Sequence, residues 1–257
     1  VQLTATVNPN TANVKTGVTW RSNDTSIATV SQSGVVTGVK NGSTTITVTT
    51  TNGKSATCAI TVQTTPTSVT MSPTSATLNL SGTKTAQLTA TVNPGTANIN
   101  KGITWKSNDT SIATVSQSGV VTGVRNGSTT IIATTGNGKT ATCTITVQTS
   151  PTSVTLNQTN VTLDISTNKT VQLKATINPS TANVQTGITW RSDDSSIATV
   201  KDGLVTGVKN GSTTITVTTD NGKSASCTIT VQTTPTGVTL NQTNVTLDMS
   251  GTKTVQL

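Results

Sequence analysis

The sequence predicts an all-β chain built from tandem β-sandwich domains. The first observation is composition: Thr supplies 67 of the 257 residues, while Glu, Phe and Tyr are absent. Thr, Val and Ile fit a half-buried pleated surface, whereas strong helix formers are scarce here. The second observation is a repeat of about 85 residues, and the third is a series of short alternating apolar runs separated by turn residues.

The repeat is fixed by three tryptophans and three cysteines. Residues Trp20, Trp105 and Trp190 are spaced by 85 and 85 positions, and Cys58, Cys143 and Cys227 by 85 and 84. The missing position lies where Ser116–Gly119 of one repeat becomes the shorter Lys201–Gly203 of the next. A hairpin loop tolerates such a deletion, so we expect a loop there.

The repeat predicts four segments. Residues 65–149 and 150–233 are two complete repeats, 1–64 is a repeat that lacks its first strands, and 234–257 supplies the first strands of a further repeat. The sequence therefore begins and ends at the same point of the 85-residue repeat. Two interpretations stay open: the chain is a window on a longer protein, or 234–257 completes the first domain of a neighbouring copy.

One repeat, 65–149, contains seven or so short strands with a turn signal about every ten residues, which is typical of a β-sandwich. Pro94 ends a long strand because proline cannot donate to a ladder. Asn126-Gly127 and Asn137-Gly138 predict tight turns. In order, the expected strands cover 68–71, 76–80, 86–92, 103–105, 112–115, 120–124, 129–135 and 141–147.

These segments resemble the bacterial immunoglobulin-like domain, group 2. The resemblance lies in ITWKSNDTSIATV at 103–115, GVVTGV at 119–124, GSTTI at 127–131 and CTITV at 143–147, and corresponding stretches recur around the other two tryptophans. It implies tandem immunoglobulin-like sandwiches of an extracellular bacterial surface or virion protein. Such domains serve as stalks or spacers and sometimes bind surfaces or glycans. The family has no common catalytic site.

The tryptophans and cysteines are predicted to form the structural core. Each Trp stands in an alternating strand with an apolar residue two positions before it, which favours the interior over a carbohydrate-stacking platform. Each Cys shares a strand face with Ile and Val, and a buried free Cys behaves as a small hydrophobe. Disulfides are not expected, because equivalent positions of successive domains lie too far apart.

The sequence predicts no catalytic, cofactor-binding or metal-binding residues, and we expect no enzyme and no cofactor. Without His or Glu, a His-based triad, a zinc–His site and a Glu pair are excluded. Asp24, Asp109 and Asp194 precede each Ile-Ala-Thr-Val segment. Capping of a turn is the expected role, since a calcium site needs several converging oxygens.

The charge pattern limits the partners. The net charge is +8, and the basic residues are spread without a run. With no Phe or Tyr to stack bases, nucleic acid is not an expected partner. No apolar stretch is long enough for membrane insertion. Attraction to an anionic cell-wall polymer or a surface glycan is the functional alternative to simple solubility.

The linkers connect these domains into a predicted extended rod. Only five residues, one of them proline, separate the last strand of one repeat from the first of the next, as in Gln63–Thr67. We therefore expect a structural spacer or stalk. The alternatives are an adhesive module for wall polymer or host glycan, and a fibre subunit that assembles with copies of itself through strand exchange by 234–257.

Overall fold

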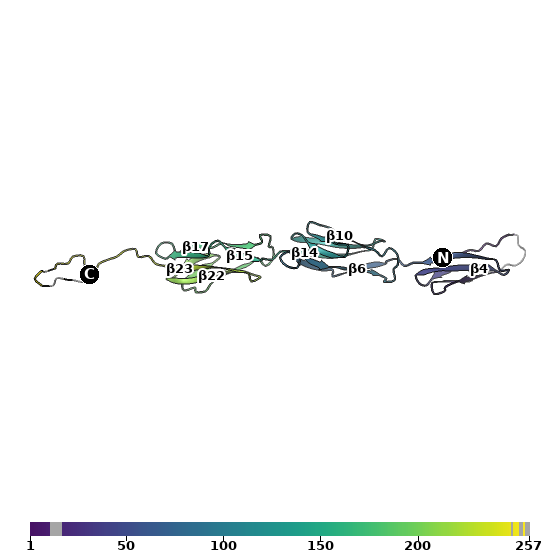
Figure 1. The fold of residues 1–257 in the computed structure, drawn as a ribbon, viewed down its shortest axis with the longest axis horizontal. Coiled ribbons are helices and arrows are strands. Elements are labelled where there is room, and N and C mark those ends of the chain that lie inside the picture. Colours follow the sequence, from purple (N-terminus) through teal and green to yellow (C-terminus); the bar gives the residue numbers. More distant parts are fainter. Residues whose placement is uncertain (11–16, 248, 252–253, 255–257) are drawn as a thin grey trace. The chain divides into compact units, whose positions relative to one another are not determined.

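The computed structural model describes residues 1–10, 17–247, 249–251 and 254. These residues form β-strands and turns and contain no helix, which confirms the all-β prediction (Figure 1). The chain divides into two compact units, Val1–Val147 and Gln148–Leu257. Below, repeat 1 denotes residues 1–64, repeat 2 residues 65–149 and repeat 3 residues 150–233.

Repeat 2 shows the full sandwich. One sheet has the order β10-β13-β14-β7, and strands β11-β12-β8 and β6-β9 make the opposing layer. The strands are β6 (Ser68–Ser72), β7 (Ser75–Asn79), β8 (Thr85–Gln87), β9 (Thr89–Asn93), β10 (Ile103–Ser107), β11 (Ala113–Val115), β12 (Val120–Gly123), β13 (Gly127–Thr135) and β14 (Thr140–Gln148).

The single strand predicted over 86–92 was wrong, because the chain changes its partner in the middle. β8 pairs with β12, whereas β9 pairs with β6. Leu88 lies between the two strands and is buried, with its N–H donating to the carbonyl of Gly119 at 2.9 Å. The alternating pattern continues through this point, so it gave no sign of the change.

Repeat 3 has the same architecture, with sheets β16-β23-β22-β19, β17-β21-β20 and β15-β18. The larger sheet of each repeat is named the long sheet below. In the long sheet of repeat 3, strand β16 runs parallel to β23, the last strand. The strands are β15 (Ser153–Leu156), β16 (Asn160–Asp164), β17 (Thr170–Gln172), β18 (Ala175–Asn178), β19 (Ile188–Ser192), β20 (Ala198–Lys201), β21 (Leu204–Gly207), β22 (Gly211–Thr219) and β23 (Ser224–Gln232).

Repeat 1 has fewer strands. Its sheets are β1-β4-β5 and β2-β3, so β5 has no neighbour on its outer edge among the described strands. In the other two repeats that edge is covered by β7 or β16. The strands are β1 (Val18–Ser22), β2 (Ala28–Val30), β3 (Val36–Gly38), β4 (Gly42–Thr50) and β5 (Ser55–Val62).

Each repeat encloses its own apolar cluster. The cluster of repeat 2 centres on Leu78, Leu88, Ile131 and Ile145, and it shares no residue with the clusters of repeats 1 and 3. Burial of such side chains stabilises each by about 1.5–3 kcal/mol. The smaller cluster of repeat 1 follows from its smaller number of strands.

A glycine turn closes each sandwich over its tryptophan. Gly119 has a φ of +82°, and a Cβ built there would lie 2.5 Å from the Leu88 carbonyl oxygen and 2.9 Å from Cζ2 of Trp105. The side chain of Gln87 braces the same turn by donating to the carbonyls of Leu88 and Ser118, both at 2.8 Å. Only glycine allows this close approach.

Replacement of Gly119 by alanine should therefore destabilise repeat 2 by about 2–4 kcal/mol, because positive φ and steric overlap act together. Gly138→Ala is the matched control, since Gly138 has a φ of +83° and open space around it. That change should cost only about 1 kcal/mol. Native-state hydrogen exchange at the Ile131 and Ile145 amides measures both effects. Equal losses in the two variants would contradict the steric explanation.

Candidate functional site

The predicted core tryptophans are half-buried, and each packs against the cluster of its own repeat. Trp105 on β10 stands opposite Ala133 of β13, while Trp20 and Trp190 stand opposite Val48 and Val217. The turn glycine covers one edge of each ring, at Cζ2.

The three cysteines are free thiols. Cys143 and Cys227 are fully buried, and burial raises the pKa of each thiol. A raised pKa lowers the thiolate fraction, so these two are poor nucleophiles and poor metal ligands at neutral pH. Cys58 is only half-buried, since it lies on β5, whose outer edge is uncovered in repeat 1.

The aspartates of the Asp-x-Ser turns act on the backbone. Asp109 Oδ1 accepts hydrogen bonds from the N–H and the hydroxyl of Ser111, at 2.9 and 2.6 Å. These bonds hold the pKa of the carboxyl below its usual range, and nearby Arg125 lowers it further. Asp24 and Asp194 bind Ser26 and Ser196 in the same way.

No group of three His, Cys, Asp or Glu side chains that could hold a metal ion occurs in the described ranges. Likewise, the described residues include no helix with the length and hydropathy to cross a membrane.

Hydroxyl groups cover the outer side of the long sheet. In repeat 2, Thr104, Thr134 and Thr140 form one row across three strands, and Thr130 with Thr144 forms another. The row between them holds Lys106, Ile132 and Thr142, so one cation and one apolar side chain join this hydroxyl face. From composition, Thr was expected only to favour strands. Within 140–146, every second residue is an exposed Thr, and these threonines alternate with buried Cys143 and Ile145. This alternation is the sequence signal that predicts the hydroxyl face.

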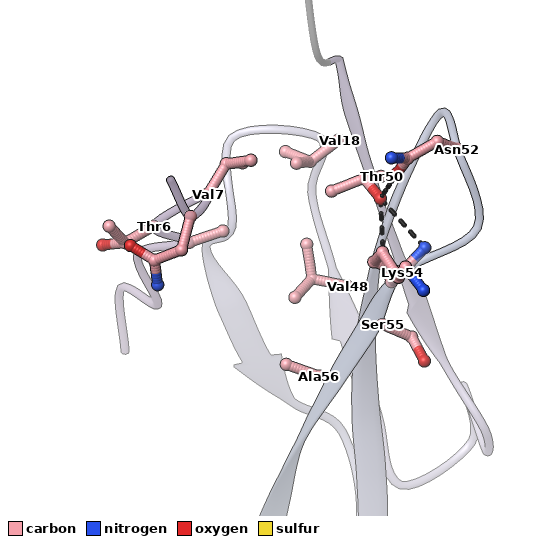
Figure 2. Close-up of a pocket in the computed structure, with 11 residues that line it drawn as sticks. Thr6, Val7, Val18, Val48, Thr50, Asn52, Lys54, Ser55 and Ala56 are labelled. Carbon is pink, nitrogen blue, oxygen red and sulfur yellow. Dashed lines mark hydrogen bonds between the residues drawn. The ribbon is translucent and has the colours of Figure 1, made fainter. Parts of the chain in front are cut away.

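Repeat 1 contains a hollow of about 160 Å³. Figure 2 shows Val7 across the hollow from Val18, Val48 and Ala56 of strands β1, β4 and β5. Lys54 and Asn52 stand at one end, where the hydroxyl of Thr50 donates to the Asn52 side chain and the Lys54 carbonyl. The walls are apolar and the mouth is polar.

In repeat 2 the matching place is filled by a methionine. By the 85-residue repeat, Ala5, Val18, Val48 and Ala56 correspond to Ala90, Ile103, Ala133 and Ala141. Those four residues belong to the cluster that contains Met71 of β6, which is only 8% exposed. The hollow of repeat 1 is thus the position of a first-strand side chain.

The Asp turn predicts an acid-dependent stability. Because the folded state lowers the pKa of Asp109, the unfolded chain binds more protons below about pH 4, its ordinary pKa range. The stabilisation is present above that pH and is lost as the pH falls toward the folded pKa. Asp109→Asn should weaken repeat 2 at pH 7, and its difference from the wild type should shrink below pH 4.

Hydrogen exchange at the Ile131 amide between pH 7 and pH 3, corrected for intrinsic rates, measures this difference. Asp202→Asn in repeat 3, followed at the Ile215 amide of that repeat, serves as the control, since the Asp202 carboxylate makes no hydrogen bond within the described part of the chain and that amide should exchange as in the wild type. A gap between wild type and Asp109→Asn that stays constant with pH would contradict the assignment.

Each of the three repeats matches a known protein family. The model of the bacterial Ig-like domain (group 2) matches residues 1–60, 66–145 and 150–229. Ice-binding protein 1 of Shewanella frigidimarina is 36% identical over 230 residues, which are 88% of this chain and 25% of that protein. Lacto-N-biosidase of Bifidobacterium bifidum is 46% identical over 70 residues, 27% of this chain and 6% of that protein. The chain spans a quarter or less of either relative.

Among solved structures, domains 4–9 of the surface layer protein SbsC align with 85% of this chain and 39% of that one, at 20% identity and a TM-score of 0.31. The family and the relatives indicate an extracellular structural or adhesive module. Since the family model covers each of the three repeats, the chain belongs to the bacterial Ig-like domain family, group 2.

Proposed function

We propose that this chain is a non-catalytic structural spacer of an extracellular bacterial surface protein. The observation that carries the proposal is the separate core of each repeat. A repeat that closes on its own residues adds length to an array without needing a distant part of the chain. Linkers of about five residues, such as Gln63–Thr67, then keep successive repeats close along the chain.

The chemistry of the polar side chains supports a role without catalysis. Cys143 and Cys227 are buried with raised thiol pKa values, and Asp24, Asp109 and Asp194 hold turns. The hydroxyl face carries one cation per repeat and lacks an aromatic platform, so we favour the structural role over the adhesive one. The hydroxyl groups keep the long sheet soluble without clustered charge.

A spacer must be elongated in solution, and small-angle X-ray scattering tests this. A compact globule of this length has a radius of gyration of about 18 Å. Three domains in a row should give a radius of gyration of about 30 Å or more, because strands of about 20–30 Å determine the length of each domain. The value should stay the same in high salt, since neutral contacts are little screened. A radius near that of the globule would contradict the proposal.

The hollow of repeat 1 supports a second candidate, assembly of this chain with copies of itself. Residues 237–247 repeat the pattern of β15 and β16 but form no strand. Leu240 corresponds to Met71 and is 60% exposed, and Leu247 corresponds to buried Leu163 and is 48% exposed. The segment therefore carries a leucine at the position of Met71, the side chain whose counterpart would fill the hollow of repeat 1.

The register of this pairing follows from repeat 3. There β16 runs parallel to β23, with Val161 opposite Ile229 and Leu163 opposite Val231. The equivalent pairing on β5 places Val245 opposite Ile60 and Leu247 opposite Val62. Strand addition of this kind supplies backbone hydrogen bonds and fills alternate side-chain pockets. A segment of the same pattern on the same polypeptide would fill the hollow equally well, so the test uses the 257-residue chain.

Light scattering across a dilution series should show that this chain associates with itself. Leu240→Asp and Leu247→Asp should abolish association, because each would bury a charge without a partner. Thr246→Asp is the matched control, since Thr246 corresponds to exposed Thr162 on the outer side of β16. A wild-type chain that stays monomeric at every concentration, or equal effects of the Leu247 and Thr246 changes, would contradict this assembly.

A further inference from the structure

The linker between repeats 1 and 2 is hydrogen-bonded on both sides. The Thr64 hydroxyl donates to Asn41 Oδ1 of repeat 1 at 2.7 Å. The Thr64 N–H donates to Asn98 Oδ1 of repeat 2 at 2.9 Å, and the Thr64 carbonyl accepts the N–H of Asn98 at 3.0 Å. All three polar groups of this one linker residue are thus engaged.

Asn41 also reaches the next repeat directly. Its amide Nδ2 donates to the carbonyl of Thr96 at 2.5 Å. Thr96 and Asn98 lie in the loop between β9 and β10, and Asn41 begins the turn that leads into β4. One side chain of repeat 1 therefore binds the linker through its oxygen and repeat 2 through its nitrogen. Thr64, Asn41, Thr96 and Asn98 are named the junction clamp below.

Each half of the junction clamp recurs in repeat 3. In the linker before it, the Thr149 N–H donates to Asn183 Oδ1 at 2.8 Å, and the Asn183 N–H donates to the Thr149 carbonyl at 2.9 Å. At its end, the Thr233 hydroxyl donates to Asn210 Oδ1 at 2.8 Å. The Thr149–Asn183 pair thus repeats the Thr64–Asn98 contacts, and the Thr233–Asn210 pair repeats the Thr64–Asn41 contact.

We propose that the junction clamp is a docking surface through which repeat 1 holds repeat 2, so that the linker is a stiff joint and not a free tether. The inference deepens the proposed spacer function and rests on it. A linker of five residues without such contacts would leave its domains more freedom to reorient. Neutral hydrogen bonds do not depend on ionic strength or on ionisation near neutral pH, so the joint keeps its stiffness across salt and pH.

Thr64→Val tests the joint with little change in shape. It removes the hydroxyl bond to Asn41 and leaves the backbone bonds to Asn98 in place. Asn41→Ala removes both contacts of that side chain, and Asn98→Ala frees the Thr64 N–H. Thr65→Val is the matched control, because Thr65 is the next linker residue, is exposed, and has no side-chain hydrogen bond in the described residues.

Two measurements on the full chain report the result. The first is the distribution of distances between nitroxide labels, attached through non-natural residues at exposed positions 57 and 142 so that the native cysteines remain. It should be narrow in the wild type and in Thr65→Val, and broader in Thr64→Val and Asn41→Ala. The second is hydrogen exchange of the residue 64 amide, which should speed up about fivefold in Asn98→Ala, the factor for one net hydrogen bond.

Distributions of equal width in the wild type, Thr64→Val and Asn41→Ala would overturn the proposal, as would free-peptide exchange rates at Thr64 in the wild type. Unchanged exchange at the Ile131 amide shows that repeat 2 stays folded in the variants. A compact radius of gyration together with a narrow distribution would reject the spacer function and leave the clamp standing, so the two failures are distinguishable.

Discussion

The sandwich depends on the contact between a glycine turn and the indole beneath it. At Gly119 the backbone lies against Trp105, accepts the Leu88 N–H and is braced by Gln87. The contact joins the turn between β11 and β12 to β10 of the opposite sheet, and the bond from Leu88 lies where the chain leaves β8 for β9. The same arrangement recurs at Gly34 and at Gly203, where the loop is one residue shorter. The deletion in repeat 3 spares this glycine.

The strand pattern and the family could be predicted from sequence because alternation, turn pairs and the 85-residue repeat are local signals. The break at Leu88 could not, since alternation there continues while the partner strand changes. The roles of Asn41 and Asn98 were also beyond local pattern, as they depend on groups about 23 and 34 residues away along the chain. Sequence likewise gave no sign that the Ser107 hydroxyl is buried with no partner in the described residues.

The separate cores, the hydroxyl face and the junction clamp use mainly two kinds of interaction: apolar packing and hydrogen bonds between neutral groups. Apolar residues are used inside each repeat, and threonine and asparagine serve on the surface and between repeats 1 and 2. Ion pairs have a minor part, since the one found among the described residues, Arg191 with Asp193, is exposed and worth little. The interactions that hold the chain together therefore respond weakly to the ionic composition outside a cell.

The parallel pairing of β16 with β23 has a mechanical consequence. These strands lie near the beginning and the end of repeat 3, and they run in the same direction. A force applied to the two ends of that repeat pulls the paired strands past each other, so their ladder bonds share the load. An antiparallel pair pulled from one end would open bond by bond, like a zipper. Shear loading of this kind lets a domain of modest thermodynamic stability resist tension.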